Sequence, residues 1–275
     1  MGRFATSGPH GALPVRLADQ GALLRGRRVL VTGAARGLGR AVAEAVVAAG
    51  GTVWLADRLE DEPLAGVAAL GAAGWTAADL SDADAAEAVV AAADEGLEGV
   101  DGVANIAGIV LHHDPLAIPA ADWARLMTVN VTASYLVAAS AARRMRAAGR
   151  PGSIVNTASE AGKVGHVDSL AYSASKAAVI SMTRMLSQAL AADDVNVNCV
   201  CPGGLDTAML REVAEVYAAR VGGRADEVLD ELVAGQLGRR AAVAEVAQVF
   251  VFLLSDAART VRGQAVNADG GDTPY

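Results

Sequence analysis

The fold is decided by the stretch from Arg28 to Gly51, RVLVTGAARGLGRAVAEAVVAAGG. Its start, Arg28 to Thr32, is a short apolar run that predicts a buried strand. A helical pattern follows from Leu38 to Ala49 and ends at a glycine pair. The loop between them is rich in glycine, so the helix begins within a tight turn. This stretch predicts the first strand and helix of an α/β domain.

Three glycines in that loop, Gly33, Gly37 and Gly39, are spaced Gly-x3-Gly-x-Gly. We expect Gly33 to allow the tight turn, Gly37 to let backbone N–H groups approach a pyrophosphate, and Gly39 to bring the helix close to the strand. The helix N-terminus, with Arg36 and Leu38 beside it, would then face the phosphates. The spacing differs from the Gly-x-Gly-x2-Gly of the standard dinucleotide fingerprint, so a purely structural glycine turn stays an alternative.

A carboxylate follows the second strand, Thr52 to Ala56, at the position where dinucleotide-binding proteins hold a ribose. Asp57 stands 24 positions after Gly33 and could accept both adenosine-ribose hydroxyls. It would also repel a 2′-phosphate, which favours NAD over NADP. Arg36 and Arg58 flank the same region and could pair with a phosphate, so NADP stays the less favoured alternative.

Strand and helix patterns alternate along the rest of the chain. Further strands are expected at Trp75–Ala78, Val100–Asn105, Ser153–Ala158, Val195–Val200 and Ala265–Ala268, and further helices near Leu64–Leu70, Ala83–Asp94, Ala121–Arg146, Leu170–Ala191 and Val243–Ser255. The alternation predicts one Rossmann-type domain over residues 25–275, a doubly wound parallel sheet with helices on both faces. Residues 1–24 have no clear period and are expected to form an N-terminal arm, either flexible or loosely held on the surface.

An insertion near residues 204–238 interrupts this alternation. It contains two weaker amphipathic helices, Thr207–Val221 and Ala225–Leu237, separated by Gly222-Gly223. An insertion at the ends of the strands is expected to cover the substrate as a lid.

The residues expected to carry catalysis are Ser159, Tyr172 and Lys176. Tyr172 and Lys176 are four apart and share one helix face, and Ser159 ends the strand that precedes them. The chain has 23 lysines and arginines, of which Lys163 and Lys176 are the only lysines, so a lysine at 176 indicates chemistry rather than surface charge.

Reduction of a ketone by hydride leaves an alkoxide that needs a proton, and a phenol supplies one readily only if its pKa falls toward neutrality. A fall of three units requires about 4 kcal/mol. An ammonium about 4 Å away supplies a Coulomb term of that size at an effective dielectric near 20. We therefore expect Lys176 to lower the pKa of Tyr172, the general acid/base, while Ser159 donates a hydrogen bond to the substrate oxygen.

With these motifs in hand, the chain resembles the short-chain dehydrogenase/reductase family from about Arg25 to Gly271. The resemblance rests on the glycine loop, on Ser159, Tyr172 and Lys176, and on further matching motifs. It implies adenine contacts from Asp79-Leu80, a cofactor segment at Asn105-Ile106-Ala107-Gly108, an active-site asparagine at Asn130, and nicotinamide contacts from Pro202-Gly203 and Thr207.

The resemblance also implies roles for some of these residues. Asn130 would keep a water for a proton relay from Lys176, and Lys176, like Tyr172, would contact the cofactor. Homotetramers are expected, built partly on the helix containing Val249–Leu254. Two departures from the family pattern are Ile106, where a second asparagine is usual, and Val261-Arg262-Gly263, where Thr-Gly is usual.

Composition excludes several other classes of function. The net charge of −8 carries no basic stripe, so neither nucleic acid nor an anionic membrane is an expected partner. No apolar run is long enough to span a bilayer, and no signal-peptide block is visible, so a cytoplasmic location is expected. Cys199 and Cys201 read as buried strand thiols, and His112 and His113 as surface residues, so no metal site is expected.

The sequence therefore predicts an NAD(H)-dependent oxidoreductase that interconverts a secondary alcohol and a ketone. The alternatives are an NADPH-dependent ketoreductase of 3-oxoacyl thioesters and, from another class, a non-catalytic dinucleotide-binding protein. Candidates to line the substrate pocket are Glu160, His166, Leu205 and Met209. Their mixed character suits a cyclic alcohol, a sugar-like polyol or a diol, and these stay open.

Overall fold

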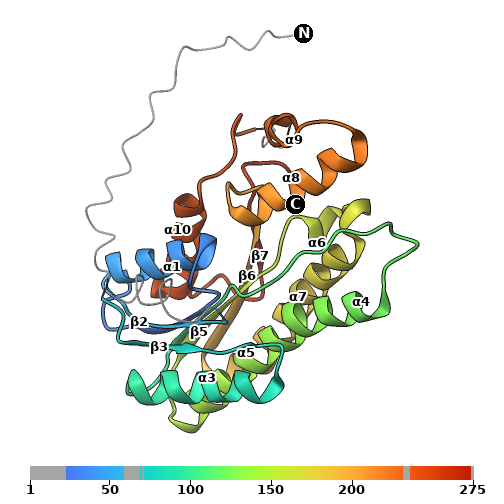
Figure 1. The fold of residues 1–275 in the computed structure, drawn as a ribbon. Coiled ribbons are helices and arrows are strands. Elements are labelled where there is room, and N and C mark those ends of the chain that lie inside the picture. Colours follow the sequence, from blue (N-terminus) through green and yellow to red (C-terminus); the bar gives the residue numbers. More distant parts are fainter. Residues whose placement is uncertain (1–22, 59–68, 70, 232–235, 274–275) are drawn as a thin grey trace, which may run out of the picture.

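The centre of the molecule is a seven-stranded parallel sheet of order β3-β2-β1-β4-β5-β6-β7 (Figure 1). This computed structural model describes residues 23–58, 69, 71–231 and 236–273. The strands are β1 (Arg28–Thr32), β2 (Thr52–Asp57), β3 (Gly74–Ala77), β4 (Gly102–Asn105), β5 (Gly152–Thr157), β6 (Val195–Pro202) and β7 (Ala265–Ala268). The strand order reverses between β1 and β4, and in such sheets a ligand binds beyond the carboxyl ends of the strands at that point.

Helices cover both faces of the sheet, which confirms the predicted fold class. One face carries α1 (Gly37–Ala48) and α10 (Val243–Leu254), and the other carries α3 (Ala83–Gly96), α5 (Ala133–Ala147) and α7 (Leu170–Ala189) (Figure 1). Further helices lie toward the carboxyl ends of the strands: α4 (Ala120–Met127), α6 (Ala161–Val164), α8 (Ala208–Val221) and α9 (Ala225–Glu231).

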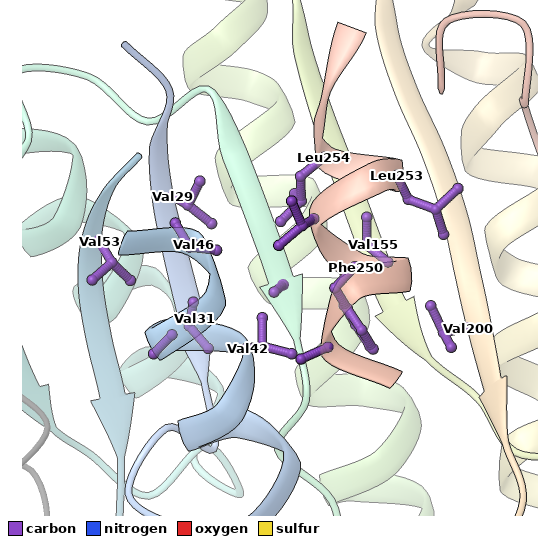
Figure 2. Close-up of a cluster of buried hydrophobic side chains, with 14 of the residues drawn as sticks. Val29, Val31, Val42, Val46, Val53, Val155, Val200, Phe250, Leu253 and Leu254 are labelled. Carbon is purple, nitrogen blue, oxygen red and sulfur yellow. The ribbon is translucent and has the colours of Figure 1, made fainter. Parts of the chain in front are cut away.

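The core between the sheet and the α1/α10 layer is aliphatic. Figure 2 shows valines of β1 and β2 facing Val42 and Val46 of α1, with Phe250 and Leu254 of α10 beside them. These side chains are almost fully removed from water. Each contributes about 1.5–3 kcal/mol of transfer free energy, so this layer holds the glycine loop of α1 firmly against the sheet.

The single long helix predicted at Ala121–Arg146 is wrong in one respect. The structure interrupts it with a π-helical turn at Thr128–Thr132, between α4 and α5. That turn has the sequence TVNVT, in which all residues but Asn130 are β-branched and pack poorly into a regular α-helix. The turn directs Asn130 inward, where its side chain is buried. Turns of this kind occur often at functional sites.

Other differences are small. Strand β6 continues past Val200 because Cys201 and Pro202 pair with Asn267 and Ala268 of β7. The short helix α6 and a 3-10 turn at Val167–Ser169 were too short for periodicity to predict.

Some predictions concern residues that the structure does not describe. The helix expected near Leu64–Leu70 lies outside the described residues, as does nearly all of the expected arm, residues 1–24. Of the second insertion helix, the described part is α9 and ends at Glu231. Within the described residues, no helix combines the length and the apolar character that crossing a membrane requires.

Candidate active site

The loop after β1 is shaped so that only glycine fits at two of its positions. A Cβ on Gly33 would lie 2.8 Å from the backbone nitrogen of Ala107, and Gly33 also has a positive φ of 67°. A Cβ on Gly39 would lie 1.9 Å from the carbonyl oxygen of Gly33. Gly37, with φ 55°, has the side chain of Thr207 as its nearest neighbour, 3.7 Å from the position of a Cβ. The three glycines thus leave the backbone bare where the loop, β4 and the Thr207 segment meet.

The glycine loop is tied to the segment that follows β4. Thr32 Oγ1 accepts hydrogen bonds from the backbone nitrogens of Ile106 and Ala107, at 3.0 and 3.2 Å. Asn105 is turned the other way, and its Nδ2 donates at 3.0 Å to both Ser134 O and Asn156 Oδ1. The side chain of Asn105 therefore fixes the carboxyl end of β4 to β5 and α5. Ile106, the departure from the usual asparagine, packs against the α1/α10 core.

Asp57 lies beside the glycine loop. Its Oδ2 accepts a hydrogen bond of 3.0 Å from the backbone nitrogen of Ala35, which holds the carboxylate beside the glycine loop. The two arginines weighed against it, Arg36 and Arg58, are exposed. Asp79 is also exposed, and backbone and side-chain hydrogen bonds with Ser81 hold the pKa of its carboxyl below the ordinary value.

Leu80, expected to contact adenine with Asp79, is buried in the core beneath α3. The Asp79-Leu80 pair thus places one polar side chain outside and one apolar side chain inside. Its contact with a cofactor stays a prediction.

Ser159, Tyr172 and Lys176 come together beyond the carboxyl end of β5. Ser159 Oγ accepts a 3.2 Å hydrogen bond from Ala161 N and is hydrogen-bonded to the side chain of Tyr172. Lys176 Nζ lies 5.6 Å from the centre of the Tyr172 ring and donates to Thr157 O at 2.7 Å. The spacing of Tyr172 and Lys176 on α7 thus places hydroxyl, phenol and amine within one small volume.

The expected effect of Lys176 on Tyr172 is wrong for the protein by itself. Burial raises the pKa of Tyr172 to about 12, although the hydrogen bond with Ser159 acts in the opposite direction. Burial also lowers the pKa of Lys176 to about 8, so the amine holds its own proton weakly. The prediction failed because burial disfavours the phenolate of Tyr172 itself, and this cost was not considered from the sequence.

Asn130 is fixed in the π-helical turn by three hydrogen bonds. Its Oδ1 accepts from Ile109 N at 2.8 Å, and its Nδ2 donates to Ile109 O at 2.9 Å and to Ser175 Oγ at 3.0 Å. A Cβ on Gly108 would lie 3.2 Å from Asn130 Oδ1 and 3.5 Å from Lys176 Nζ. Asn130, Gly108 and Lys176 are therefore close neighbours.

The segment after β6 joins this group to the glycine loop. Pro202 O accepts a 3.0 Å hydrogen bond from Glu160 N. A Cβ on Gly203 would lie 3.0 Å from the Cα of Asp269. Thr207 caps α8 by accepting a 3.3 Å hydrogen bond from Leu210 N. The segment from Pro202 to Thr207 thus connects the residues that follow β5, Ser159 among them, with the glycine loop.

The four substrate-pocket candidates have different surroundings. Glu160 and His166 form a pair, Met209 is exposed, and Leu205 is buried in the core. His166 Nε2 lies 3.0 and 2.9 Å from the two carboxylate oxygens of Glu160, and this hydrogen bond raises the pKa of His166. Met209 is exposed on α8. Leu205 is buried in the α1/α10 core, so it is a packing residue rather than a visible pocket wall.

Two groups near the site escaped the sequence analysis. Lys163 Nζ donates to Ala265 O at 2.9 Å and also bonds Asn267 Oδ1, which ties α6 to β7. The scarcity of lysine in the sequence could have indicated a specific role for Lys163, because it applies to Lys163 and Lys176 equally. Thr157 Oγ1 is buried and makes no hydrogen bond within the part of the chain that the structure describes.

These observations test whether the residues fit a bound dinucleotide. The Asn156 side chain faces α5 and α7, so alternation along β5 turns the Thr157 side chain toward the α1/α10 face. Its orphaned hydroxyl and the bare glycine loop are two features that a polar, phosphate-bearing cofactor would satisfy. The site fits such a group.

Cys199, Cys201, His112 and His113 do not come together as one group of candidate ligands in the described residues. Cys199 and Cys201 are buried free thiols on β6. His112 Nδ1 lies 3.3 Å from Asp168 O, and His113 Nε2 lies 3.0 Å from Asp122 Oδ2. Both rings are half-buried rather than fully on the surface. Over the described residues, no three metal-ligating side chains gather at one point.

The sequence of this chain is similar to those of known oxidoreductases. The family model for short chain dehydrogenase matches residues 27–218. The cis-4-hydroxycyclohexanecarboxylate dehydrogenase of Sinomonas cyclohexanicum is 35% identical over 90% of this chain and 96% of its own length. The 3-oxoacyl-[acyl-carrier-protein] reductase of Aquifex aeolicus is 32% identical over 90% and 98%. The NAD-dependent glycerol dehydrogenase of Listeria innocua is 36% identical over 89% and 92%.

Solved structures agree in fold. A short-chain type dehydrogenase/reductase from Mycobacterium marinum superposes with a TM-score of 0.83 at 30% identity, covering 94% of this chain and all of the other. A protein from Agrobacterium tumefaciens with bound NADP gives a TM-score of 0.79 at 33% identity, covering 92% and 98%. Nicotinamide dinucleotides are thus the cofactors found among these relatives, in both the NAD and the NADP form.

Proposed function

Because this chain belongs to the short-chain dehydrogenase family, an oxidoreductase family that uses nicotinamide dinucleotides, we propose that it is an NAD(H)-dependent enzyme interconverting a secondary alcohol and a ketone by hydride transfer. The observation that carries the proposal is the meeting of Ser159, Tyr172 and Lys176 beyond β5. The partner is a small-molecule alcohol or ketone.

Each side chain of this group has one task. Tyr172 gives a proton to the carbonyl oxygen during reduction and takes it back during oxidation. Ser159 Oγ accepts from Ala161 N and shares a hydrogen bond with the Tyr172 hydroxyl, and its O–H turns to the substrate oxygen when substrate binds. Asn130, held by Ile109 and Ser175, positions a water that returns protons to Lys176.

A bound nicotinamide dinucleotide would supply the hydride donor or acceptor, and its oxidised ring would add a positive charge that favours the phenolate of Tyr172 and opposes the effect of burial. The residues proposed to hold the cofactor are Gly33, Arg36, Gly37, Leu38, Gly39, Asp57, Asp79, Leu80, Asn105, Ala107, Gly108, Tyr172, Lys176, Pro202, Gly203 and Thr207.

The preference for NAD rests on Asp57. Its carboxylate is held at the glycine loop by Ala35 N, where it would meet the 2′-phosphate of NADP with like charge. Relatives include both an NAD-dependent enzyme and a structure with NADP bound, so the preference is argued from this residue alone.

The alternative is an NADPH-dependent 3-oxoacyl-thioester ketoreductase, in line with the relative from Aquifex aeolicus. The negative charge of Asp57 disfavours NADPH because it would repel the 2′-phosphate. A non-catalytic dinucleotide-binding protein is disfavoured because Ser159, Tyr172 and Lys176 are all in place.

The deciding experiment is a coenzyme-by-substrate panel followed at the NADH absorbance. The purified protein is given NAD or NADP with secondary alcohols, and NADPH with a 3-oxoacyl thioester. We expect turnover of alcohols with NAD. Turnover of the thioester with NADPH alone would favour the alternative, and tight coenzyme binding without any turnover would favour the non-catalytic protein.

Three further features belong to the proposal. The insertion carrying α8 and α9 acts as a lid over the substrate. The assembled enzyme is a homotetramer that uses α10, on which Phe252 is 40% exposed although its neighbours are buried. The enzyme works in the cytoplasm, where the free thiols of Cys199 and Cys201 stay reduced.

A further inference from the structure

Glu160 is fixed in the wall of the site, directly after Ser159. Its backbone nitrogen donates to Pro202 O at 3.0 Å, and its carbonyl oxygen accepts from Lys163 N at 2.8 Å and Val164 N at 3.1 Å. Its carboxylate is near enough to Tyr172 to raise the pKa of that phenol. The negative charge of Glu160 therefore acts on the side chain that is proposed to transfer the proton.

A carboxylate in this place works against proton release from Tyr172, so a reason for it is needed. Fold stability is a weak reason, because its partner His166 has a side chain that is 53% exposed, and ion pairs in contact with solvent contribute little. The Glu160 side chain itself is only 13% exposed. This leaves ligand binding as the role that we consider for the Glu160 carboxylate.

The carboxylate can accept more hydrogen bonds than it receives. His166 Nε2 offers one N–H, which the two oxygens of Glu160 share at 3.0 and 2.9 Å. A carboxylate has about four lone-pair positions, so acceptor capacity is left for a ligand. The complementary ligand group is a hydrogen-bond donor, which in an alcohol substrate is a second O–H. Asp168 and Asp272 also act on His166, so the surroundings are acidic and disfavour an anionic ligand.

We propose that Glu160 accepts a hydrogen bond from a second hydroxyl group of the substrate, so that the substrate is an uncharged vicinal diol or polyol. The reacting oxygen binds Ser159 and Tyr172, and Glu160 is the next residue after Ser159, so a hydroxyl on the neighbouring carbon is the one within reach. This inference rests on the proposed function and names the substrate class of the same site.

The test compares three ring alcohols of similar shape, cis-1,2-cyclohexanediol, cis-2-methoxycyclohexanol and cyclohexanol, and the open-chain pair 2,3-butanediol and 2-butanol. The methyl ether keeps the second oxygen but cannot donate. We expect kcat/KM for each diol to exceed that of its partners tenfold or more, the size of effect expected for a hydrogen bond to a charged group.

Variants assign this preference to Glu160. Glu160→Met keeps the chain length without an acceptor and should bring the diol and the methyl ether to within about twofold of each other, because the charged hydrogen bond is gone. Glu160→Gln keeps a neutral acceptor and should give an intermediate ratio. The matched control is Glu44→Gln, an equal loss of charge at an exposed carboxylate of α1 whose partner is Arg40. It should leave the diol preference as in the wild type.

The outcomes separate the inference from the function on which it rests. Equal kcat/KM for diol and methyl ether in the wild type, or a preference that survives in both Glu160 variants, overturns the inference while the oxidoreductase function stands. Absence of turnover with all five alcohols and both coenzymes overturns the proposed function and the inference together. Circular dichroism of each variant shows that it is folded, and if Glu160→Met does not fold, the Gln variant decides.

Discussion

At the scale of single residues, Tyr172 shows how far a spacing argument reaches. The spacing of Ser159, Tyr172 and Lys176 predicted that these side chains meet, and the structure brings them together. The pKa values did not follow from spacing, since they depend on how deeply each group is buried. Burial raises the pKa of Tyr172 to about 12 and lowers the pKa of Lys176 to about 8. We therefore expect Tyr172 to need the positive charge of an oxidised cofactor in order to transfer a proton near neutral pH.

Removing the phenol hydroxyl tests this role of Tyr172. We expect Tyr172→Phe to lower kcat/KM at least a hundredfold, in line with the contribution of general acid/base catalysis, while NADH affinity stays near that of the wild type. Steady-state kinetics and calorimetric titration measure the two. Tyr135→Phe, at an exposed tyrosine of α5, is the matched control and should be fully active. Turnover retained in Tyr172→Phe would remove the tyrosine from the mechanism.

The buried amine predicts a pH-dependent cost in stability. The pKa of Lys176 is depressed from 10.5 to about 8, so between these values the unfolded chain binds more protons and stability rises with pH. Below pH 8 the full cost is present. We expect Lys176→Met to be more stable than the wild type there by up to about 3 kcal/mol, less what its hydrogen bond to Thr157 O contributed.

Urea unfolding of the coenzyme-free proteins measures this difference as a function of pH. The advantage of Lys176→Met should shrink as the pH rises from 8 toward 10.5, where the wild-type amine is neutral in both states. Below about pH 9 the phenol of Tyr172 keeps its proton in both the folded and the unfolded chain, so it does not enter the comparison there. A difference that stays constant with pH would mean that the pKa of Lys176 is not depressed in the folded protein.

Asp57 predicts a change of coenzyme choice. Asp57→Ala removes the like charge that would face a 2′-phosphate, so we expect the ratio of kcat/KM for NADP to that for NAD to rise at least tenfold. The same variant loses the hydrogen bond to Ala35 N, so some activity with NAD should be lost as well. Glu87→Ala, which removes a carboxylate between α3 and α5, is the control. An unchanged ratio in Asp57→Ala would place Asp57 outside the cofactor site.

At the scale of elements, strong periodicity predicted well and local irregularity did not. The helices α1, α3, α7 and α10 lie within a few residues of their predicted bounds, because each buries one apolar face. The π-helical turn at Thr128–Thr132 has the same apolar pattern as the helices around it. Its β-branched residues were a signal, but a weak one, because tertiary contacts of Asn130 decide the turn.

The glycine loop of α1 predicts a severe effect from one methyl group. A Cβ on Gly39 would lie 1.9 Å from Gly33 O, so Gly39→Ala must displace the first turn of α1. We expect NADH binding to weaken by more than tenfold and stability to fall by several kcal/mol, because overpacking is met by backbone rather than by a side chain. Calorimetry and urea unfolding measure both.

The control is Gly149→Ala, where φ is +60° and no atom lies within 4 Å of the added Cβ. That change carries only the strain of a left-handed alanine, about 1 kcal/mol, and should not affect NADH binding. NADH affinity in Gly39→Ala equal to that in Gly149→Ala would show that the loop is not a cofactor site.

At the scale of the whole molecule, the parallel sheet explains why distant residues meet. All seven strands point the same way, so the segments after β1, β2, β4, β5 and β6 gather at one edge. This followed from the alternating pattern in the sequence. The role of Leu205 in the core and that of Lys163 as a tie to β7 did not, because both depend on how segments far apart in the chain cross.

The outward face of α10 predicts an effect on assembly. Phe250, Leu253 and Leu254 fill the core, while Phe252 is 40% exposed and is available to another subunit. We expect the wild type to form tetramers and Phe252→Arg to form smaller particles, because a charge in an apolar interface is costly. Light scattering gives the masses. Leu116→Arg, at a side chain that is 97% exposed, should keep the wild-type mass. An undiminished mass for Phe252→Arg would exclude this face.

The placement of the two lysines has a practical consequence for labelling. Lys176 is 4% exposed and bonded to Thr157 O, and Lys163 is half-buried and bonded to β7. An amine-directed reagent therefore reaches either side chain only while the surrounding structure is open. The rate at which these two amines are acylated would report how often the structure around them opens. A lower rate in the presence of coenzyme would measure how far coenzyme binding suppresses that opening.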